Sequence, residues 1–191
     1  MPTGLILLDI IFIAFQTSYV LVCKSPAKAI TTMPNQPLFV KMALLSWEGQ
    51  LKRATNLFNT LTNEQLSREI APGRNTGIYL MGHLIAIHDA ILPLFGLGER
   101  LHPELDEAFI NNPDKSGKQM VTLSQLREYW PEVHNHLGER LASLSEEQWF
   151  QRHNSVSEED FQKEPHRNKL NVLLGRANHI GYHLGQLVLL K

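Results

Sequence analysis

The stretch "NKLNVLLGRANHIGYHLGQL", residues 168–187, has the pattern of an amphipathic helix and carries two histidines four positions apart. Its apolar residues recur at spacings of three and four, the period of a helix with one buried face. Asn168 stands directly before this pattern, where an asparagine commonly caps a helix N-terminus. Because residues four apart are neighbours on a helix, His179 and His183 share one face. The stretch predicts the last helix of an all-α protein, with two imidazoles placed to bind one ion.

Three more segments carry the helical period: residues 37–61, 75–94 and 122–144. Capping boxes, a Ser or Thr followed three positions later by Gln, mark the third long helix and two short ones: Thr62 with Gln65, Thr122 with Gln125, and Ser145 with Gln148. Residues 96–121 are expected to form a crossover loop with one helical turn, and the polar stretch 151–167 a second loop. With no convincing strand, the pattern predicts an all-α four-helix bundle with a long crossover between helices two and three.

The two halves of the chain show a weak internal echo. In each half a capping-box turn is followed by an Arg-Asn pair, Arg74–Asn75 or Arg167–Asn168, and then by a long helix that bears histidine. The echo predicts two related helix pairs, with their histidines at similar depth. The alternative is that such short matches recur by chance.

The composition excludes several classes of protein. A chain of 191 residues suits one domain with a sizeable core. With 18 basic and 19 acidic residues there is no positive excess, so we expect no nucleic-acid binding. The single cysteine, Cys23, excludes an internal disulfide and a thiolate cluster, so a metal site must use nitrogen and oxygen ligands. One cysteine also fits a reducing compartment, and we expect the protein in the cytoplasm.

Residues 1–36 are expected to be an N-terminal extension before a bundle domain at residues 37–191. Residues 4–22 are mostly apolar, and three interpretations stay open. A secretory signal would make the protein exported, but no Lys or Arg precedes the apolar run. A membrane anchor would carry an acidic residue that is costly within a bilayer. We favour a start placed too early, with Met33 or Met42 as the true first residue, because the helical patterning begins only near Pro37.

Two imidazoles alone make a weak metal site, so a third ligand must come from another helix. His83 is the natural candidate, because it lies midway along the second predicted helix and follows Gly82, which lets a neighbouring helix approach. His88 lies about 140° around that helix and faces elsewhere. We therefore predict a divalent metal on His83, His179 and His183; the alternative is that these are ordinary core histidines. The remaining histidines lie two apart on helix three or in loops: His102, His134, His136, His153 and His166.

Three further polar residues fall near the same faces. Gln186 and Asn168 return to within about 20° of the direction of His179, and Tyr79 lies one turn before His83. Polar side chains on inward stripes are costly to bury unless a polar partner, a metal or a ligand satisfies them. We expect these three residues to line a pocket or support the metal ligands. The alternatives are a core aromatic for Tyr79 and a solvated or capping amide for Gln186.

The motifs "GHL" at residues 82–84 and "HIGYHLGQL" at residues 179–187 resemble the signature of the DinB-like (YfiT-like) four-helix-bundle superfamily. The likeness covers about residues 37–191. It implies that a histidine of helix two and an H-x3-H pair of helix four hold a divalent metal, usually zinc or nickel, which corresponds here to His83, His179 and His183. Superfamily members with known activity include low-molecular-weight thiol S-transferases and a thiol-dependent maleylpyruvate isomerase, and members often form homodimers.

The expected function is that of a metal-dependent enzyme acting on a small molecule. Three neutral ligands cancel none of the charge of an ion, and such an ion lowers the pKa of a bound water or thiol. A small-thiol S-transferase and a hydrolase both fit this chemistry. The alternative is a non-catalytic metal- or ligand-binding bundle, in which a fourth protein side chain would complete the coordination.

Overall fold

The predicted long helices are all present in the computed structural model, which describes residues 35–118 and 121–191. They are α2 (Gln36–Thr60), α4 (Gly77–Asp89) with its continuation α5 (Ile91–Phe95), α7 (Leu123–Ala142) and α10 (Lys169–Leu187). The shorter elements are α3 (Asn63–Ser67), α6 (Leu105–Phe109), α8 (Glu146–Trp149), α9 (Glu158–Lys163) and the 3₁₀ turn η1 (Val188–Leu190). Over the described residues there is no strand, only two isolated β-bridges, so the all-α prediction is confirmed.

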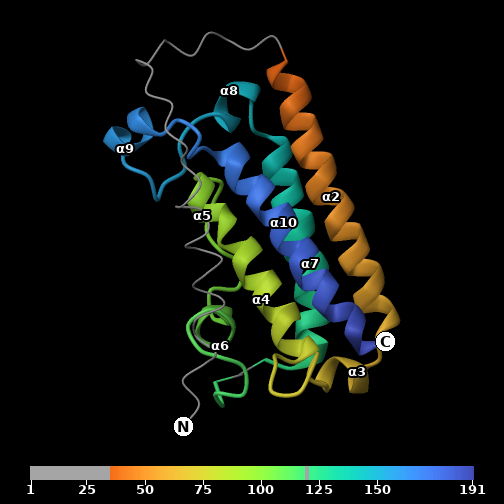
Figure 1. Ribbon diagram of the computed structural model, residues 1–191. Helices are drawn as coiled ribbons and strands as arrows, with labels where there is room; N and C mark the ends of the chain where they lie inside the picture. Colours follow the sequence, from red (N-terminus) through yellow and green to blue (C-terminus); the bar gives the residue numbers. More distant parts are fainter. Residues whose placement is uncertain (1–34, 119–120) are drawn as a thin grey trace. The chain divides into compact units, whose positions relative to one another are not determined.

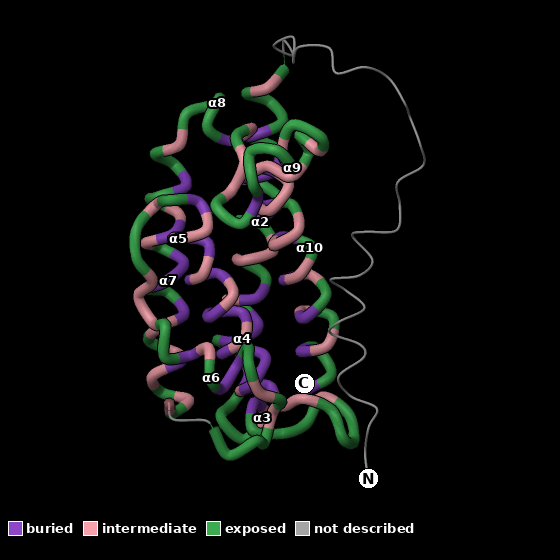
Figure 2. The backbone as a smooth tube through the Cα atoms, turned by 90° about the vertical axis from the view of Figure 1, so that its left-hand side faces the viewer, coloured by how far each residue is buried: buried purple, intermediate pink, exposed green. Residues whose placement is uncertain are grey.

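The long helices of the unit Asn35–Lys191 lie side by side as a four-helix bundle (Figure 1). Helix α10 packs against both α2 and α4, and α4 also packs against α7. Helices α2 and α10 run in one direction, whereas α4 and α7 run in the other (Figure 1). Their inward faces are buried in one hydrophobic core and their outward faces are exposed (Figure 2). Helices α4 and α10, nearly a hundred residues apart in sequence, are thus antiparallel neighbours.

The three capping boxes form as the sequence predicts. The side chains of Thr62, Thr122 and Ser145 each accept a hydrogen bond from the backbone N–H three residues on, and the glutamine at that position accepts one from the cap residue in return. Each pair satisfies two backbone donors that the first turn of a helix leaves unpaired. These boxes fix where α3, α7 and α8 begin.

The second predicted helix is shorter and broken. It starts at Gly77 after the N-cap Thr76, rather than at Asn75, and it is interrupted at Ala90 between α4 and α5. The interruption follows from Pro93, which has no N–H to donate to the carbonyl four residues earlier and whose ring crowds it. The segment Gly77–Phe95 is long and apolar enough to cross a membrane by composition, but most of it is buried within the bundle.

The crossover between α5 and α7 contains the single expected helical turn, α6. It is tied to the end of α4 by Asp89, a fully buried carboxylate. Asp89 accepts hydrogen bonds from the backbone N–H groups of Leu101 and His102, each at 2.9 Å, and from Arg100 Nε at 3.2 Å. Arg100 also pairs with Asp106 of α6. This network holds α6 against α4.

Helix α9 corrects the prediction of a loop at residues 151–167. Ser157 caps it by accepting a hydrogen bond from the N–H of Asp160, and its first turn is acidic, which suits the positive end of a helix. No residue of α9 is buried. It therefore has no hydrophobic period that a sequence pattern could reveal.

The internal echo has a structural counterpart. In the first half, α3 is followed by an isolated antiparallel bridge between Glu69 and Thr76 and then by α4; in the second half, α8 is followed by a bridge between Arg152 and Asn168 and then by α10. The two helices that carry His83, His179 and His183 are therefore entered in the same way.

The expectations for the N-terminal extension fall on residues 1–34, which lie outside the described residues. The signal, anchor and early-start interpretations of residues 4–22 stay predictions, as does the domain boundary at residue 37.

Candidate metal centre

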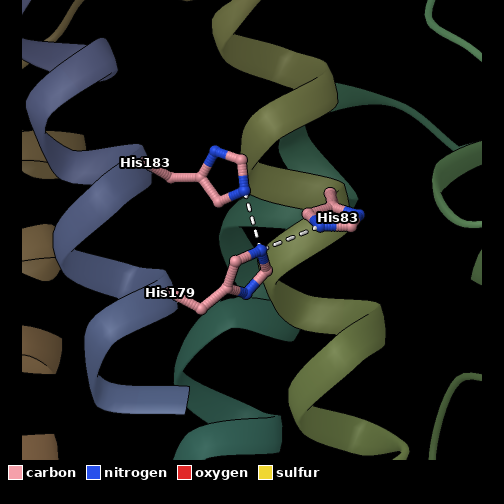
Figure 3. Close-up of side chains that lie close together, drawn as sticks. All are labelled: His83, His179 and His183. Atoms are coloured by element: carbon pink, nitrogen blue, oxygen red, sulfur yellow. Dashed lines mark hydrogen bonds between the residues drawn. The ribbon is translucent and has the colours of Figure 1, made fainter. Parts of the chain in front are cut away.

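Three histidine rings converge between α4 and α10 (Figure 3). His83 comes from the middle of α4, and His179 and His183 come from successive turns of α10. The Nε2 atom of His179 lies 3.3 Å from Nε2 of His83 and 2.9 Å from Nε2 of His183. The three candidate ligand atoms all lie within 4.8 Å of one another. The structure thus brings together the three residues that the sequence analysis selected.

A backbone carbonyl of the crossover orients His83. Its Nδ1 donates a hydrogen bond to the carbonyl oxygen of Phe109, the last residue of α6, at 2.8 Å. Phe109 approaches α4 this closely because residue 82 is glycine: a Cβ there would lie 2.5 Å from the Phe109 ring. Gly82 was predicted to admit a neighbouring helix, and that helix is the short α6.

A side chain of α10 orients His183. The Nδ1 atom of His183 donates to Oε1 of Gln186 at 2.7 Å. Hydrogen bonds of this kind fix the ring and the tautomer of metal-binding histidines, leaving the other nitrogen to the metal. Gln186, one of the predicted supporting residues, therefore contacts the cluster directly.

The two histidines of α10 are kept neutral by their surroundings. Burial lowers the pKa of His179 to about 2, and electrostatic interactions with His183, His83 and Arg176 act in the same direction. Burial likewise lowers the pKa of His183 to about 4, again with His83 adding to the effect. Both rings are therefore unprotonated at neutral pH, the form in which imidazole binds metals.

The arrangement fits a divalent ion. His83 and His183 both use their Nδ1 hydrogen elsewhere, so their Nε2 atoms carry lone pairs. Both lone pairs face Nε2 of His179, which can hold at most one hydrogen, whereas a cation between the rings satisfies all three. Two ligands about 2.0–2.1 Å from a tetrahedral ion lie about 3.3 Å apart, close to the observed separations. In the part of the chain that the structure describes, no carboxylate, thiol or fourth imidazole joins this group.

The other two predicted supporting residues have different positions. The ring of Tyr79 is stacked on that of His83, with centroids 6.2 Å apart, and its hydroxyl donates to the carbonyl of Asn112. Asn168 is not brought to the cluster: it caps α10 by accepting from the N–H of Asn171, and its amide donates to Pro165. It points in the expected direction around the helix but lies eleven residues before His179, about 16 Å along the axis.

Comparison with known protein families identifies the family of this chain. The sequence matches the DinB superfamily over residues 46–187, a range that includes all three histidines. The chain belongs to the DinB superfamily. The resemblance seen in the histidine motifs is thereby confirmed, and this superfamily is helical and generally metal-binding. No curated protein matches the sequence.

This DinB-superfamily chain also has a cavity of about 430 Å³ near the N-terminus of α4, and none of the three histidines lines it. Tyr79 and Phe109, the residues in contact with the His83 ring, form part of its wall. Thr76, Asp114 and Lys115 line another part, where the carboxylate of Asp114 accepts from the backbone N–H of Thr76 at 2.6 Å. Cavities of this size hold small molecules.

A buried histidine pair that the sequence did not predict joins α4 and α7. Nδ1 of His88 lies 2.8 Å from Nε2 of His134, and Nδ1 of His134 donates to the carbonyl of Trp130 at 2.6 Å. Burial lowers the pKa of His134 to about 4, and burial, with a smaller contribution from His134, lowers the pKa of His88 well below its usual value. Sequence spacing gave no signal, because the pair joins two helices through their packing.

Proposed function

We propose that the chain is a divalent-metal-dependent enzyme whose ion is held by His83, His179 and His183. The observation that carries the proposal is the convergence of three imidazole Nε2 atoms with no fourth His, Cys, Asp or Glu ligand among the described residues. Catalytic zinc sites commonly have three protein ligands, whereas structural sites have four. Nitrogen ligands suit zinc and nickel, and we propose one of these as the native ion.

The reaction that we propose is transfer of a small thiol to an electrophile. A divalent ion on three neutral imidazoles retains its full charge and lowers the pKa of a bound thiol or water, so that the nucleophile is formed near neutral pH. In the transfer, the thiol loses its S–H proton to solvent, the sulfur forms a bond to an electrophilic carbon, and the leaving group departs with the bonding electron pair.

The protein orients the proposed metal-binding rings. The carbonyl of Phe109 and the amide of Gln186 hold two of the rings in the tautomer that exposes Nε2. Tyr79, fixed by its hydrogen bond to Asn112, forms the wall between His83 and the cavity.

Metal content tests the ligand set. We expect near-stoichiometric zinc or nickel in untagged protein, a large loss in His83→Ala and His179→Ala, and unchanged content in His166→Ala, a control at an exposed histidine. Elemental analysis after extensive dialysis measures all four proteins. Equal metal content in the four would refute the proposed site.

Activity then separates the candidate functions. We expect metal-loaded protein to couple a small thiol to a chromogenic aryl halide, and chelation or His179→Ala to abolish this rate. Metal-dependent hydrolysis of a nitrophenyl ester, without thiol transfer, would identify a hydrolase instead. Stoichiometric metal with neither activity would support a non-catalytic metal-binding bundle.

A further inference from the structure

Arg176 of α10 is a partly buried cation without an anionic partner among the described residues. Its Nε atom is buried and has no hydrogen-bond partner, and over the described residues no carboxylate forms an ion pair with its guanidinium. Burial lowers the pKa of Arg176, but arginine stays charged at any physiological pH. A charge that loses part of its hydration without gaining a partner is unfavourable.

Position on α10 places Arg176 next to the histidine cluster. It precedes His179 by three residues, about 4.5 Å along the helix axis, and precedes His183 by seven, which returns to within about 20° of the same direction. Arg176 and the two ligands therefore form one stripe of the helix that faces α4. No other arginine lies on this helix.

The surroundings of Arg176 contain imidazoles rather than carboxylates. Its charge lowers the pKa of three histidines, each from a different segment: His88 of α4, His153 of the loop after α8, and His179 of α10. None of these groups can carry a negative charge. Nε2 of His88 is also buried without a hydrogen-bond partner. The region around Arg176 and His88 therefore has a positive charge without a counter-ion and two buried nitrogen atoms without hydrogen-bond partners.

We propose that Arg176 binds an oxyanion of the substrate, a carboxylate or phosphate group, while the reacting end of the same molecule lies at the three-histidine cluster. The inference rests on the proposed function, whose substrate class it narrows to acidic small molecules. A guanidinium matches an oxyanion geometrically, because two parallel N–H groups reach two oxygens. The ligand would supply the negative charge that the described residues do not.

Ligand-induced thermal shift of the full chain tests the proposal directly. The probes are succinate, inorganic phosphate and the neutral analogue succinamide, each applied to the parent protein, to Arg176→Gln and to Arg53→Gln. Arg53 is an exposed arginine of α2 and serves as the matched control. At about tenfold above its Kd, the bound oxyanion raises the melting temperature by about 3–6 °C.

We expect succinate or phosphate, but not succinamide, to shift the parent protein and Arg53→Gln, with at least tenfold weaker apparent affinity in Arg176→Gln. A larger shift with one of the two oxyanions identifies which group the site takes. No shift of the parent protein with either oxyanion, or an equal shift in Arg176→Gln, overturns the proposal.

Running each titration with metal-loaded and chelator-stripped protein separates this inference from the proposed function. Absence of bound metal in the parent protein defeats the proposed function, yet anion binding at Arg176 remains measurable in the stripped form. A shift that requires metal and is unchanged in Arg176→Gln assigns the anion to the ion and overturns the inference.

A second variant distinguishes ligand binding from a structural role. If the guanidinium is unpaired in the ligand-free protein, Arg176→Met should melt at the same or a higher temperature, because an apolar side chain of similar length replaces an uncompensated charge. The same variant should lose the oxyanion-dependent shift. A lower melting temperature for Arg176→Met would show that the guanidinium has a stabilising partner within the protein, contrary to the proposal.

Discussion

Replacing Gly82 by alanine places a methyl group where the ring of Phe109 already lies. The new Cβ would be 2.5 Å from one ring carbon and 2.6 Å from two others, whereas carbon atoms pack at about 3.5–4.0 Å. The ring must therefore retreat by about 1 Å. Phe109 is only 1% exposed, so the ring can retreat only together with the backbone of α6.

The stability change has two opposing parts. Forcing an extra methyl group into a filled core costs about 1–3 kcal/mol. Alanine in place of glycine in a helix interior returns about 1 kcal/mol. The free energy of unfolding should therefore fall by up to about 2 kcal/mol, and a chain of this size should melt about 2–4 °C lower for each kcal/mol lost.

The larger effect should be on metal binding. The carbonyl of Phe109 accepts the 2.8 Å hydrogen bond that orients His83, and a retreat of about 1 Å breaks it. Loss of such a supporting hydrogen bond typically weakens metal affinity by about 10–100-fold. Competition between the protein and a chromogenic chelator for zinc measures this affinity, and circular dichroism measures the melting temperature.

Two controls separate this effect from a general effect of alanine. Gly185→Ala adds a methyl group two residues after His183, where a Cβ meets nothing within 4 Å, so affinity should be unchanged and stability slightly raised. Phe109→Leu in the Gly82→Ala background removes the crowded ring atoms and should restore most of the affinity. Zinc affinity of Gly82→Ala within twofold of the parent protein would refute the link between Gly82, Phe109 and His83.

Two more predictions follow from hydrogen bonds and burial. Gln186→Leu removes the acceptor of His183 Nδ1 and should weaken zinc affinity about 10–100-fold in the same competition assay, whereas a change below twofold would contradict the orienting role. The folded-state pKa of His134 is lowered to about 4, and that of His88 is also lowered, while the unfolded chain binds protons near pH 6.5. The free energy of unfolding of the metal-free protein should therefore fall as pH falls from 6.5 towards 4, by at most about 1.4 kcal/mol per pH unit for each of these two histidines. Urea titrations at several pH values measure this slope, and the double variant His88→Leu/His134→Leu should show a shallower one.

The parts of the fold that the sequence predicted are those with local signals. Each long helix carries a hydrophobic period, and each capping box places a hydroxyl and an amide three residues apart, so both are visible within a short window. The pair His179 and His183 was visible for the same reason. His83 could be added because helix geometry excluded the other histidine of its own helix.

The parts that escaped prediction depend on packing between segments. The hydrogen-bond acceptor for His83 is a backbone carbonyl of α6. Every residue has a backbone carbonyl, so the residue type cannot predict this contact. The pair of His88 and His134 joins residues 46 positions apart. Asn168 was predicted to support the cluster because it faces nearly the same direction around α10 as His179. The direction around a helix does not give the distance along its axis, which here is too large for contact.

His83 and His179 are 96 residues apart in sequence, yet their rings face each other across α4 and α10. An ion shared by them would close a covalent-like loop that contains α5 to α9, including the whole of α7. A cross-link that closes a loop of this length lowers the conformational entropy of the unfolded chain, which stabilises the folded state by about 4.7 kcal/mol for a disulfide around 100 residues. The ion would then cross-link the two ends of half of the chain. Its release would set how quickly that half unfolds and how readily proteases cleave it.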